Sequence, residues 1–288
     1  MSTRSYVSIN SVTSQGLDRT MSKPSAASLS EHLKILYEYR DLLKMWTIRE
    51  IKVRYRQSFL GAAWAILQPL GLMLVFTAVF SYLTRVPTGD VPYPLFCYAA
   101  LLPWTFLATS VSFAAPSMVS NLNLVTKIYF PREILPMAIV IAAFVDFLVA
   151  SLVFAGMLAF YRVAPTINLL WLPALLAIQI ALTLGAVLFL SALGVRYRDI
   201  RFVVPLGLQI WMFASPVIYP ASLIPSRFQA MYSLNPTVGL MNAYRSVVIH
   251  GNAPEATSLI TSFAISVTLI LAGYVYFKRC ESSFADII

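Results

Sequence analysis

The chain has 288 residues, of which 59% are apolar and 11% are charged. A soluble globular domain is about 45–50% apolar and about 25% charged, so an ordinary soluble enzyme is excluded. The long apolar runs exclude a disordered chain, and two cysteines are too few for a disulfide-stapled scaffold. The composition is that of a polytopic membrane protein.

Six long apolar runs predict six membrane-spanning helices in an all-α protein. A helix needs about 20 apolar residues to cross a hydrocarbon core about 30 Å thick. Five of the runs carry no charge, and the third carries a single charge, Asp146. An outer-membrane barrel would instead show short stretches of alternating polarity. The predicted spans cover about residues 60–84, 93–119, 134–160, 168–194, 202–220 and 258–277.

The basic residues predict that both chain ends lie in the cytoplasm, because positively charged loops stay on that side. With the N-terminus inside, only four of the 21 Lys and Arg residues fall outside, namely Arg85, Arg162, Arg227 and Arg245. Topology and anionic lipid then explain the net charge of +9, and we expect no nucleic-acid partner.

Two N-terminal segments precede the first span. Residues 1–30 are rich in Ser and Thr and predict a flexible cytoplasmic tail. Residues 31–57 mix apolar and basic side chains, which predicts an amphipathic helix in the inner headgroup layer. Two interpretations explain this pattern equally well. In the first, the helix only anchors the chain to lipid; in the second, its basic side chains also bind a pyrophosphate head group. The candidate phosphate-binding residues are Arg49, Lys52, Arg54 and Arg56.

The segment at 121–133, NLNLVTKIYFPRE, is more apolar than a solvated loop of this length needs. Because exposed apolar patches mark interaction sites, we expect a short cytoplasmic helix whose exposed aromatic side chains dock another protein. A helix lying on the membrane surface is the alternative, and Pro131 is expected in the first turn of the next helix. The candidate docking residues are Leu124, Val125, Lys127, Ile128, Tyr129, Phe130, Pro131, Arg132 and Glu133.

On the outer side, residues 221–257 contain apolar stretches too short to cross the membrane. Proline and glycine interrupt them, so we expect short re-entrant or interfacial helices covered by protein.

Motifs for chemistry are missing from the sequence. No G-x-x-x-x-G-K-[ST] motif occurs, so the chain does not hydrolyse ATP in that manner. No Cys/His cluster has metal-ligand spacing, and the two histidines lie on opposite sides of the predicted topology. We therefore expect no catalytic residue, metal or cofactor on this chain.

Asp146 is the only charge predicted at membrane depth, which makes it a functional candidate. A buried carboxyl satisfied by Ser, Gln or Tyr of a neighbouring span is the simpler interpretation. Several aromatic residues near the spans are candidates for stacking on sugar rings, although most aromatics there pack or anchor. The stacking candidates are Trp64, Tyr98, Trp104 and Phe106.

Five ordered blocks carry a family resemblance over roughly residues 36–288. They are KVRYRQSFLGAAWAILQPL at 52–70, PWTF at 103–106, LVTKIYFPREILPMA at 124–138, GVRYRDIRFVVPLGLQIWMFASPVIYP at 194–220 and LNPTVGLMNAYRSVV at 234–248. In these blocks the chain resembles the membrane subunit of type-2 ABC exporters for polysaccharides, such as O-antigen, capsular polysaccharide and teichoic acid.

The resemblance implies an ABC-2 (type V) exporter fold over residues 58–288 and a homodimer in the bacterial inner membrane. It implies two copies of a separate ATPase that bind ATP and Mg²⁺, and a lipid-linked polysaccharide as substrate. By the same resemblance, residues 31–57 form a gate helix, 121–131 couple to the ATPase, and 221–250 cap the exit. An ABC-2 permease for another lipid or a drug, or an ion-coupled carrier that depends on Asp146, are the alternatives.

Overall fold

The computed structural model describes Lys34, residues 37–56, 58–84 and 86–121, Leu124, residues 130–281 and Phe284, with only the backbone of Tyr82 and Leu83. The predicted tail at 1–30 and the candidates Val125, Lys127, Ile128 and Tyr129 lie outside the described residues. The chain divides into two units, Met1–Arg40 and Asp41–Ile288. In the first unit, the Arg40 guanidinium lies 4.7 Å from the centre of the Tyr37 ring.

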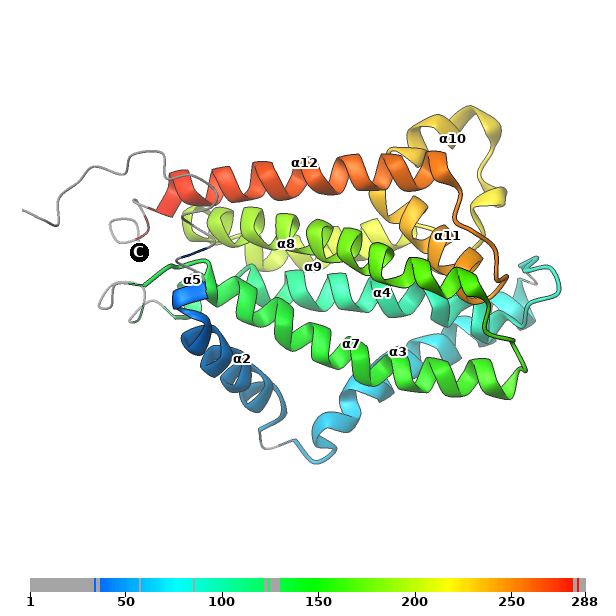
Figure 1. Ribbon diagram of the computed structural model, residues 1–288, viewed down its shortest axis with the longest axis horizontal. Coiled ribbons are helices and arrows are strands. Elements are labelled where there is room, and N and C mark those ends of the chain that lie inside the picture. Colours follow the sequence, from blue (N-terminus) through cyan, green and yellow to red (C-terminus); the bar gives the residue numbers. More distant parts are fainter. Residues whose placement is uncertain are drawn as a thin grey trace, which may run out of the picture. The chain divides into compact units, whose positions relative to one another are not determined.

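The described residues form helices and turns without a strand, which confirms the all-α fold class. The helices, in chain order (Figure 1), are α2 (Arg40–Tyr55), η1 (Gly61–Ala63), α3 (Trp64–Phe76), the π-helical η2 (Thr77–Leu83), α4 (Tyr93–Ala114), α5 (Ser117–Ser120), α7 (Ile134–Phe160), η3 (Ile167–Trp171), α8 (Leu172–Arg196), α9 (Ile200–Phe213), η4 (Ala221–Leu223), α10 (Ser226–Ser233), α11 (Pro236–Val248) and α12 (Ala256–Glu281).

Five helical segments are long and apolar enough to cross a membrane, and they coincide with five of the six predicted spans. These segments are Gly61–Ser81, Tyr93–Ala114, Ile134–Phe160, Ile167–Arg196 and Ala256–Glu281. The second ends at Ala114 rather than near residue 119, and Pro116 explains this end because proline cannot donate to a helical carbonyl.

The fifth predicted span is not one continuous helix. Helix α9 has 14 residues and is about 21 Å long, which is shorter than the hydrocarbon core. Pro216 follows the helix end closely, and a residue before proline avoids the helical conformation. Non-helical chain therefore continues from Ala214 to Pro220.

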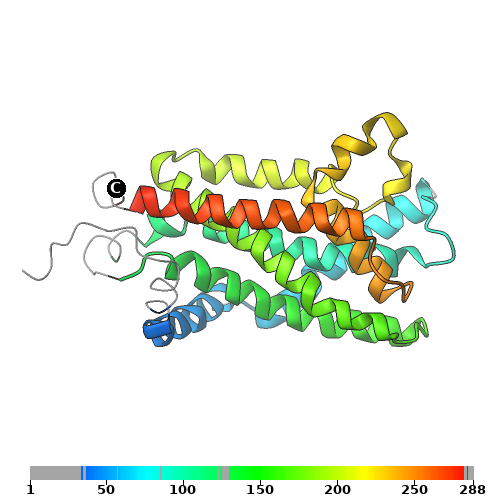
Figure 2. The ribbon, with the colours of Figure 1, turned by 45° about the horizontal axis from the view of Figure 1, so that its top comes forward.

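Helix α4 lies at the centre of the bundle and contacts α3, α7, α8, α9 and α11. In its membrane-length window 78% of the residues are buried, against 11% for Gly61–Ser81. Helices α8 and α12 lie side by side in both ribbon views (Figure 2). A Cβ atom on Gly273 would lie 2.4 Å from the Gly185 carbonyl oxygen, so these two backbones are in direct contact.

The helices place the segments of each predicted side at a common end. In Figure 1, α2, α5 and the last turn of α12 lie at one end of the bundle, and α10 and α11 lie at the other. This alternation agrees with the predicted order of inner and outer segments. The sidedness itself rests on the distribution of Lys and Arg and stays a prediction.

Candidate functional site

The last turn of α2 brings two polar side chains to the middle of α7. The Arg54 guanidinium forms an ion pair with the Asp146 carboxylate, and the Tyr55 hydroxyl donates a hydrogen bond of 2.6 Å to Asp146 Oδ1. The Arg54 guanidinium also lies 4.6 Å from the centre of the Phe113 ring on α4. The one charge of the third predicted span is therefore paired with the helix that precedes the first.

Burial explains why these groups occur together. The Arg54 and Asp146 side chains are 12% and 18% exposed, and a charge removed from water is tolerated when it is paired and hydrogen-bonded. Burial, and then the hydrogen bond to Asp146, raise the pKa of the Tyr55 hydroxyl above its ordinary value. Tyr55 therefore keeps its proton and acts as a donor to the carboxylate.

A cavity of about 150 Å³ adjoins this ion pair, between the end of α2 and helices α3, α4 and α7. Such a volume equals the share of about five waters in the liquid. The polar groups of its wall are Arg54, Tyr55, Gln68, Thr105, Thr109 and Asp146, and its aromatic groups are Trp64, Phe106, Phe113 and Phe147. This wall offers flat aromatic faces beside hydrogen-bonding groups and a charge pair, which suits hydroxyl-bearing or phosphate-bearing ligands.

The four phosphate-binding candidates of α2 do not form one cluster. Helical geometry places Lys52 and Arg56 on the same face and Arg54 on the opposite one. Lys52 and Arg56 are exposed, whereas Arg54 is turned inward to Asp146. The Arg49 guanidinium lies 4.1 Å from the Trp46 ring centre and 3.2 Å from Asn121 Oδ1. Two separate arrangements follow, an exposed basic face and a buried ion pair.

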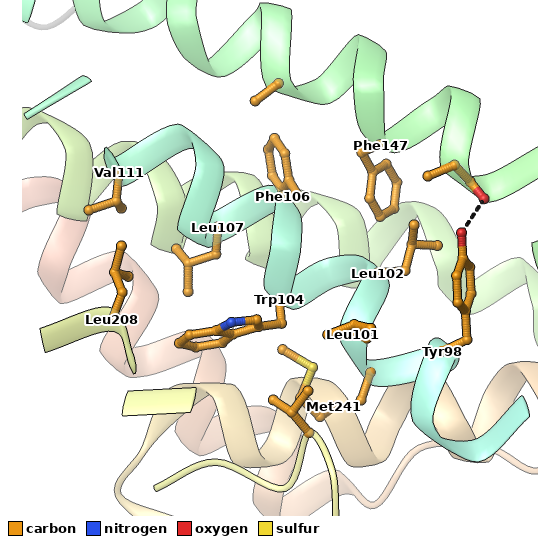
Figure 3. Packing of buried hydrophobic residues seen from close by; sticks show 14 of the residues in the cluster. Tyr98, Leu101, Leu102, Trp104, Phe106, Leu107, Val111, Phe147, Leu208 and Met241 are labelled. Atoms are coloured by element: carbon orange, nitrogen blue, oxygen red, sulfur yellow. Dashed lines mark hydrogen bonds between the residues drawn. The ribbon is translucent and has the colours of Figure 1, made fainter. Parts of the chain in front are cut away.

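The four stacking candidates also separate into two groups. Trp64 and Phe106 line the cavity, and Phe106 is also part of the core, whereas Tyr98 and Trp104 lie in the core without lining the cavity. Trp104 is 4% exposed and meets Trp211 edge-on at 5.8 Å, and the Tyr98 hydroxyl donates to the Ala150 carbonyl at 3.3 Å. Figure 3 shows Phe106 pointing toward Phe147 while Trp104 points to the other side of α4.

The described part of the candidate docking segment corrects two predictions. Phe130 is 5% exposed, so the expectation that its ring is exposed is wrong. Pro131 lies before the helix rather than in its first turn, because α7 begins at Ile134. Leu124 is half-buried. The apolar character of this segment therefore reflects packing within the chain at Phe130.

Arg132 and Glu133 connect the start of α7 to the end of α12, a link that the sequence analysis missed. The Glu133 carboxylate accepts a hydrogen bond of 2.8 Å from Lys278 Nζ, and Lys278 lies 2.9 Å from Glu281. The Arg132 guanidinium donates to the Glu281 backbone carbonyl, and it lies 5.9 Å from the Phe284 ring centre. No signal in the sequence pairs residues so far apart.

At the other end of the bundle, α11 carries a buried arginine. Arg245 is 4% exposed and donates to the carbonyl oxygens of Phe96 at 3.1 Å and Val217 at 2.8 Å. Its guanidinium lies 3.6 Å from the centre of the Phe96 ring. Residues 221–250 do form short helices, as predicted, but the sequence analysis gave Arg245 no role. Its position among the apolar residues of α11 is the signal that points to it.

The comparison with known sequences identifies the class of protein. The family model of the ABC-2 type transporter matches residues 41–249, so the chain belongs to this family. This match confirms the resemblance in the sequence blocks.

The relatives narrow the class further. The chain is 35% identical over 256 residues to the O-antigen export system permease protein RfbA of Myxococcus xanthus, covering 88% of this chain and 97% of the relative. It is 28% identical over 249 residues to RfbA of Klebsiella pneumoniae, covering 86% and 95%. It is 26% identical over 242 residues to the polysialic acid transport protein KpsM of Escherichia coli, covering 82% and 92%.

Proposed function

We propose that the chain is the membrane permease subunit of an ATP-driven ABC transporter that exports a lipid-linked polysaccharide, O-antigen or a similar glycan, across the bacterial inner membrane. The observation that carries this proposal is the near full-length match to an O-antigen export permease, with 97% of that relative covered. A separate ATPase present in two copies binds ATP and Mg²⁺, and two copies of this chain form the conduit.

The basic face of α2 receives the pyrophosphate of the lipid carrier. Lys52 and Arg56 support this step because both are exposed on one face of the helix. The cavity behind them takes the first sugar, with Trp64 and Phe106 in its wall. Arg54 stays paired with Asp146 on the opposite side of α2 and forms part of the cavity wall. ATP binding by the ATPase can move the membrane helices only if two conformations of this chain differ in their affinity for the ATPase.

We further propose six crossings, with α9 and residues 214–220 together forming the fifth. The helix spans about 21 Å of a core about 30 Å thick, and a chain of seven residues is long enough to reach the remainder. Irregular backbone at that depth must be covered by protein. Val217 and Ile218 are 0% and 1% exposed. Their carbonyls accept hydrogen bonds from Arg245 and Tyr93, at 2.8 and 2.7 Å.

Exposed apolar faces support the homodimer. Helix α3 carries Leu74 and Val75 at 62% and 58% exposure. Such faces pack against lipid or a second copy, and a shared conduit requires the second copy to cover part of them. Both termini lie in the cytoplasm in this arrangement.

The test is export by the reconstituted complex. The chain is co-expressed with its ATPase candidate and placed in vesicles, and ATP hydrolysis and movement of a polyprenyl-linked glycan are measured together. We expect hydrolysis that needs both chains and is stimulated by the glycan. Stimulation by another lipid or a drug instead would identify a different ABC-2 substrate, and transport that follows a proton gradient and needs Asp146 without ATP would identify a carrier.

A matched pair of variants tests the basic face. Lys44 and Lys52 are both exposed on α2, two turns apart. We expect Lys52→Glu to reduce export strongly and Lys44→Glu to leave it within about twofold, because Lys52 lies in the last turn of α2 near Arg56, whereas Lys44 lies two turns earlier. Equal export by the two variants would refute the head-group assignment while leaving the transporter class untouched.

A further inference from the structure

We propose that a second cavity, at the turn between α8 and α9, binds the phosphate group of a membrane lipid. This cavity measures about 210 Å³ and lies where the ends of α4 and α8 meet the starts of α5 and α9. It lies at the end of the bundle that holds α2 and the last turn of α12 (Figure 1). It shares no lining residue with the cavity beside Asp146.

The rim of the cavity carries unpaired positive charge. Arg198 and Arg201 line it, both side chains are exposed, and in the described part of the chain neither forms an ion pair. Arg196 precedes them in the sequence but does not line the cavity, and Asp199 is the one acid of this turn. A net positive cavity mouth at headgroup level attracts phosphate, which arginine binds with two parallel hydrogen bonds.

The wall of the cavity is apolar, which is what the glycerol or prenyl part of a lipid requires. Ala115, Pro116, Val119 and Ile200 form much of this wall. Its inner limit is fixed because α4 and α8 touch there. A Cβ atom on Gly194 would lie 2.5 Å from the Ala115 carbonyl oxygen. A free inorganic anion has no apolar group that could contact this wall.

An apolar track for a hydrocarbon chain leaves the cavity along α9. Phe202, Leu206 and Ile210 are 66%, 60% and 61% exposed, and a spacing of four residues places them on one face of the helix. The face begins next to Arg201. A phosphate held by Arg198 and Arg201 would therefore leave its acyl or prenyl chain lying against this face.

Two lipids carry the chemistry that this site recognises, a resident anionic glycerophospholipid and a polyprenyl pyrophosphate. The site does not depend on the proposed substrate, because either lipid is present in a bacterial membrane. No residue of α2 lines this cavity. A chain that exports no polysaccharide could therefore still bind lipid here, and a chain that binds no lipid here could still export polysaccharide.

Native mass spectrometry of the delipidated full chain in detergent tests the proposal. The probes are phosphatidylglycerol, diacylglycerol with the same acyl chains but no phosphate, and polyprenyl pyrophosphate. We expect phosphatidylglycerol to bind at least tenfold more tightly than diacylglycerol. Displacement of phosphatidylglycerol by polyprenyl pyrophosphate would identify a site that also accepts the carrier, and no displacement would identify a site for a resident phospholipid.

Variants locate the binding to this cavity. Arg198→Gln/Arg201→Gln should weaken phosphatidylglycerol binding about thirty-fold, the effect of two arginines beside an anionic headgroup. Val119→Phe should weaken it without any change of charge, because Val119 lines the cavity and is 41% exposed. The matched control is Arg162→Gln/Arg227→Gln, which removes the same charge from two exposed arginines elsewhere. Equal affinity of the control and the Arg198/Arg201 variant, or equal binding of diacylglycerol, would overturn the proposal.

Discussion

Replacing Lys278 by Met should destabilise the protein far more than replacing its partner Glu133 by Gln. The Glu133 side chain is 3% exposed and that of Lys278 is 23% exposed. Lys278→Met leaves a buried carboxylate without its cation, and such a loss costs about 3–5 kcal/mol. We take the lower end, about 3 kcal/mol, because Lys278 is partly solvated. Glu133→Gln keeps the shape and a hydrogen bond, and Lys278 still pairs with Glu281 at 2.9 Å, so its cost is about 1 kcal/mol.

The assay is thermal unfolding of the purified chain, followed by tryptophan fluorescence in one detergent at fixed pH. A loss of about 3 kcal/mol corresponds to a melting temperature lower by roughly 6–12 °C. The double variant Glu133→Leu/Lys278→Met should recover most of this loss, because an apolar pair can replace a buried ion pair. If Glu133→Gln destabilised the chain as much as Lys278→Met, the stranded buried carboxylate would not be the source of the cost.

Three further changes test other contacts. Gly273→Leu should abolish folding or lower the melting temperature sharply, because its Cβ would lie 2.4 Å from a backbone oxygen. The control Gly156→Ala places its Cβ where no atom lies within 4 Å, so it should be neutral or stabilising. Protein yield and melting temperature are the measurements. Arg245→Met should lower the free energy of unfolding by about 2–3 kcal/mol, because two buried carbonyls lose their donor. In the same unfolding assay, replacing the exposed Arg227 by Met should lower it by less than about 0.5 kcal/mol. Tyr55→Phe should cost about 1.5 kcal/mol through the lost bond to a charged acceptor, and export should be measured beside stability.

The spans that the sequence predicts best are those that hydrocarbon alone dictates. The predicted third span, 134–160, coincides with α7 at both ends, because charged residues lie beyond it on each side. The fifth predicted span differs because its helix ends at Phe213, and in the non-helical chain beyond it Arg245 and Tyr93 donate hydrogen bonds to the carbonyls of Val217 and Ile218. Those donors come from α11 and α4. An apolar run thus predicts that a segment lies in lipid or in the protein core, but not that it stays helical.

The candidate site was predicted in composition and not in arrangement. Arg54 and Asp146 were predicted as separate features because 92 positions separate them in the sequence, whereas the structure pairs them directly. The spacing of Lys52, Arg54 and Arg56 already implies that the middle residue faces away from the other two. What the spacing cannot supply is the acid that this middle residue meets. The exposure of Phe130 was predicted wrongly for the same reason. Whether an apolar side chain in a loop packs inside the chain or binds another protein depends on its neighbours in the fold.

Helix α7 joins the two ion pairs mechanically. Glu133 lies at its first turn, next to the expected coupling segment, and binds the end of α12. Asp146 lies 13 residues further along, about 20 Å away on a rigid helix, and binds Arg54 of α2. A displacement of α7 at its first turn must therefore move α12 and α2 with it or break one pair. Breaking the Glu133 pair strands a carboxylate that is 3% exposed. The Asp146 side chain is 18% exposed, so opening its pair leaves a less buried carboxylate, which makes the α2 contact the easier one to release.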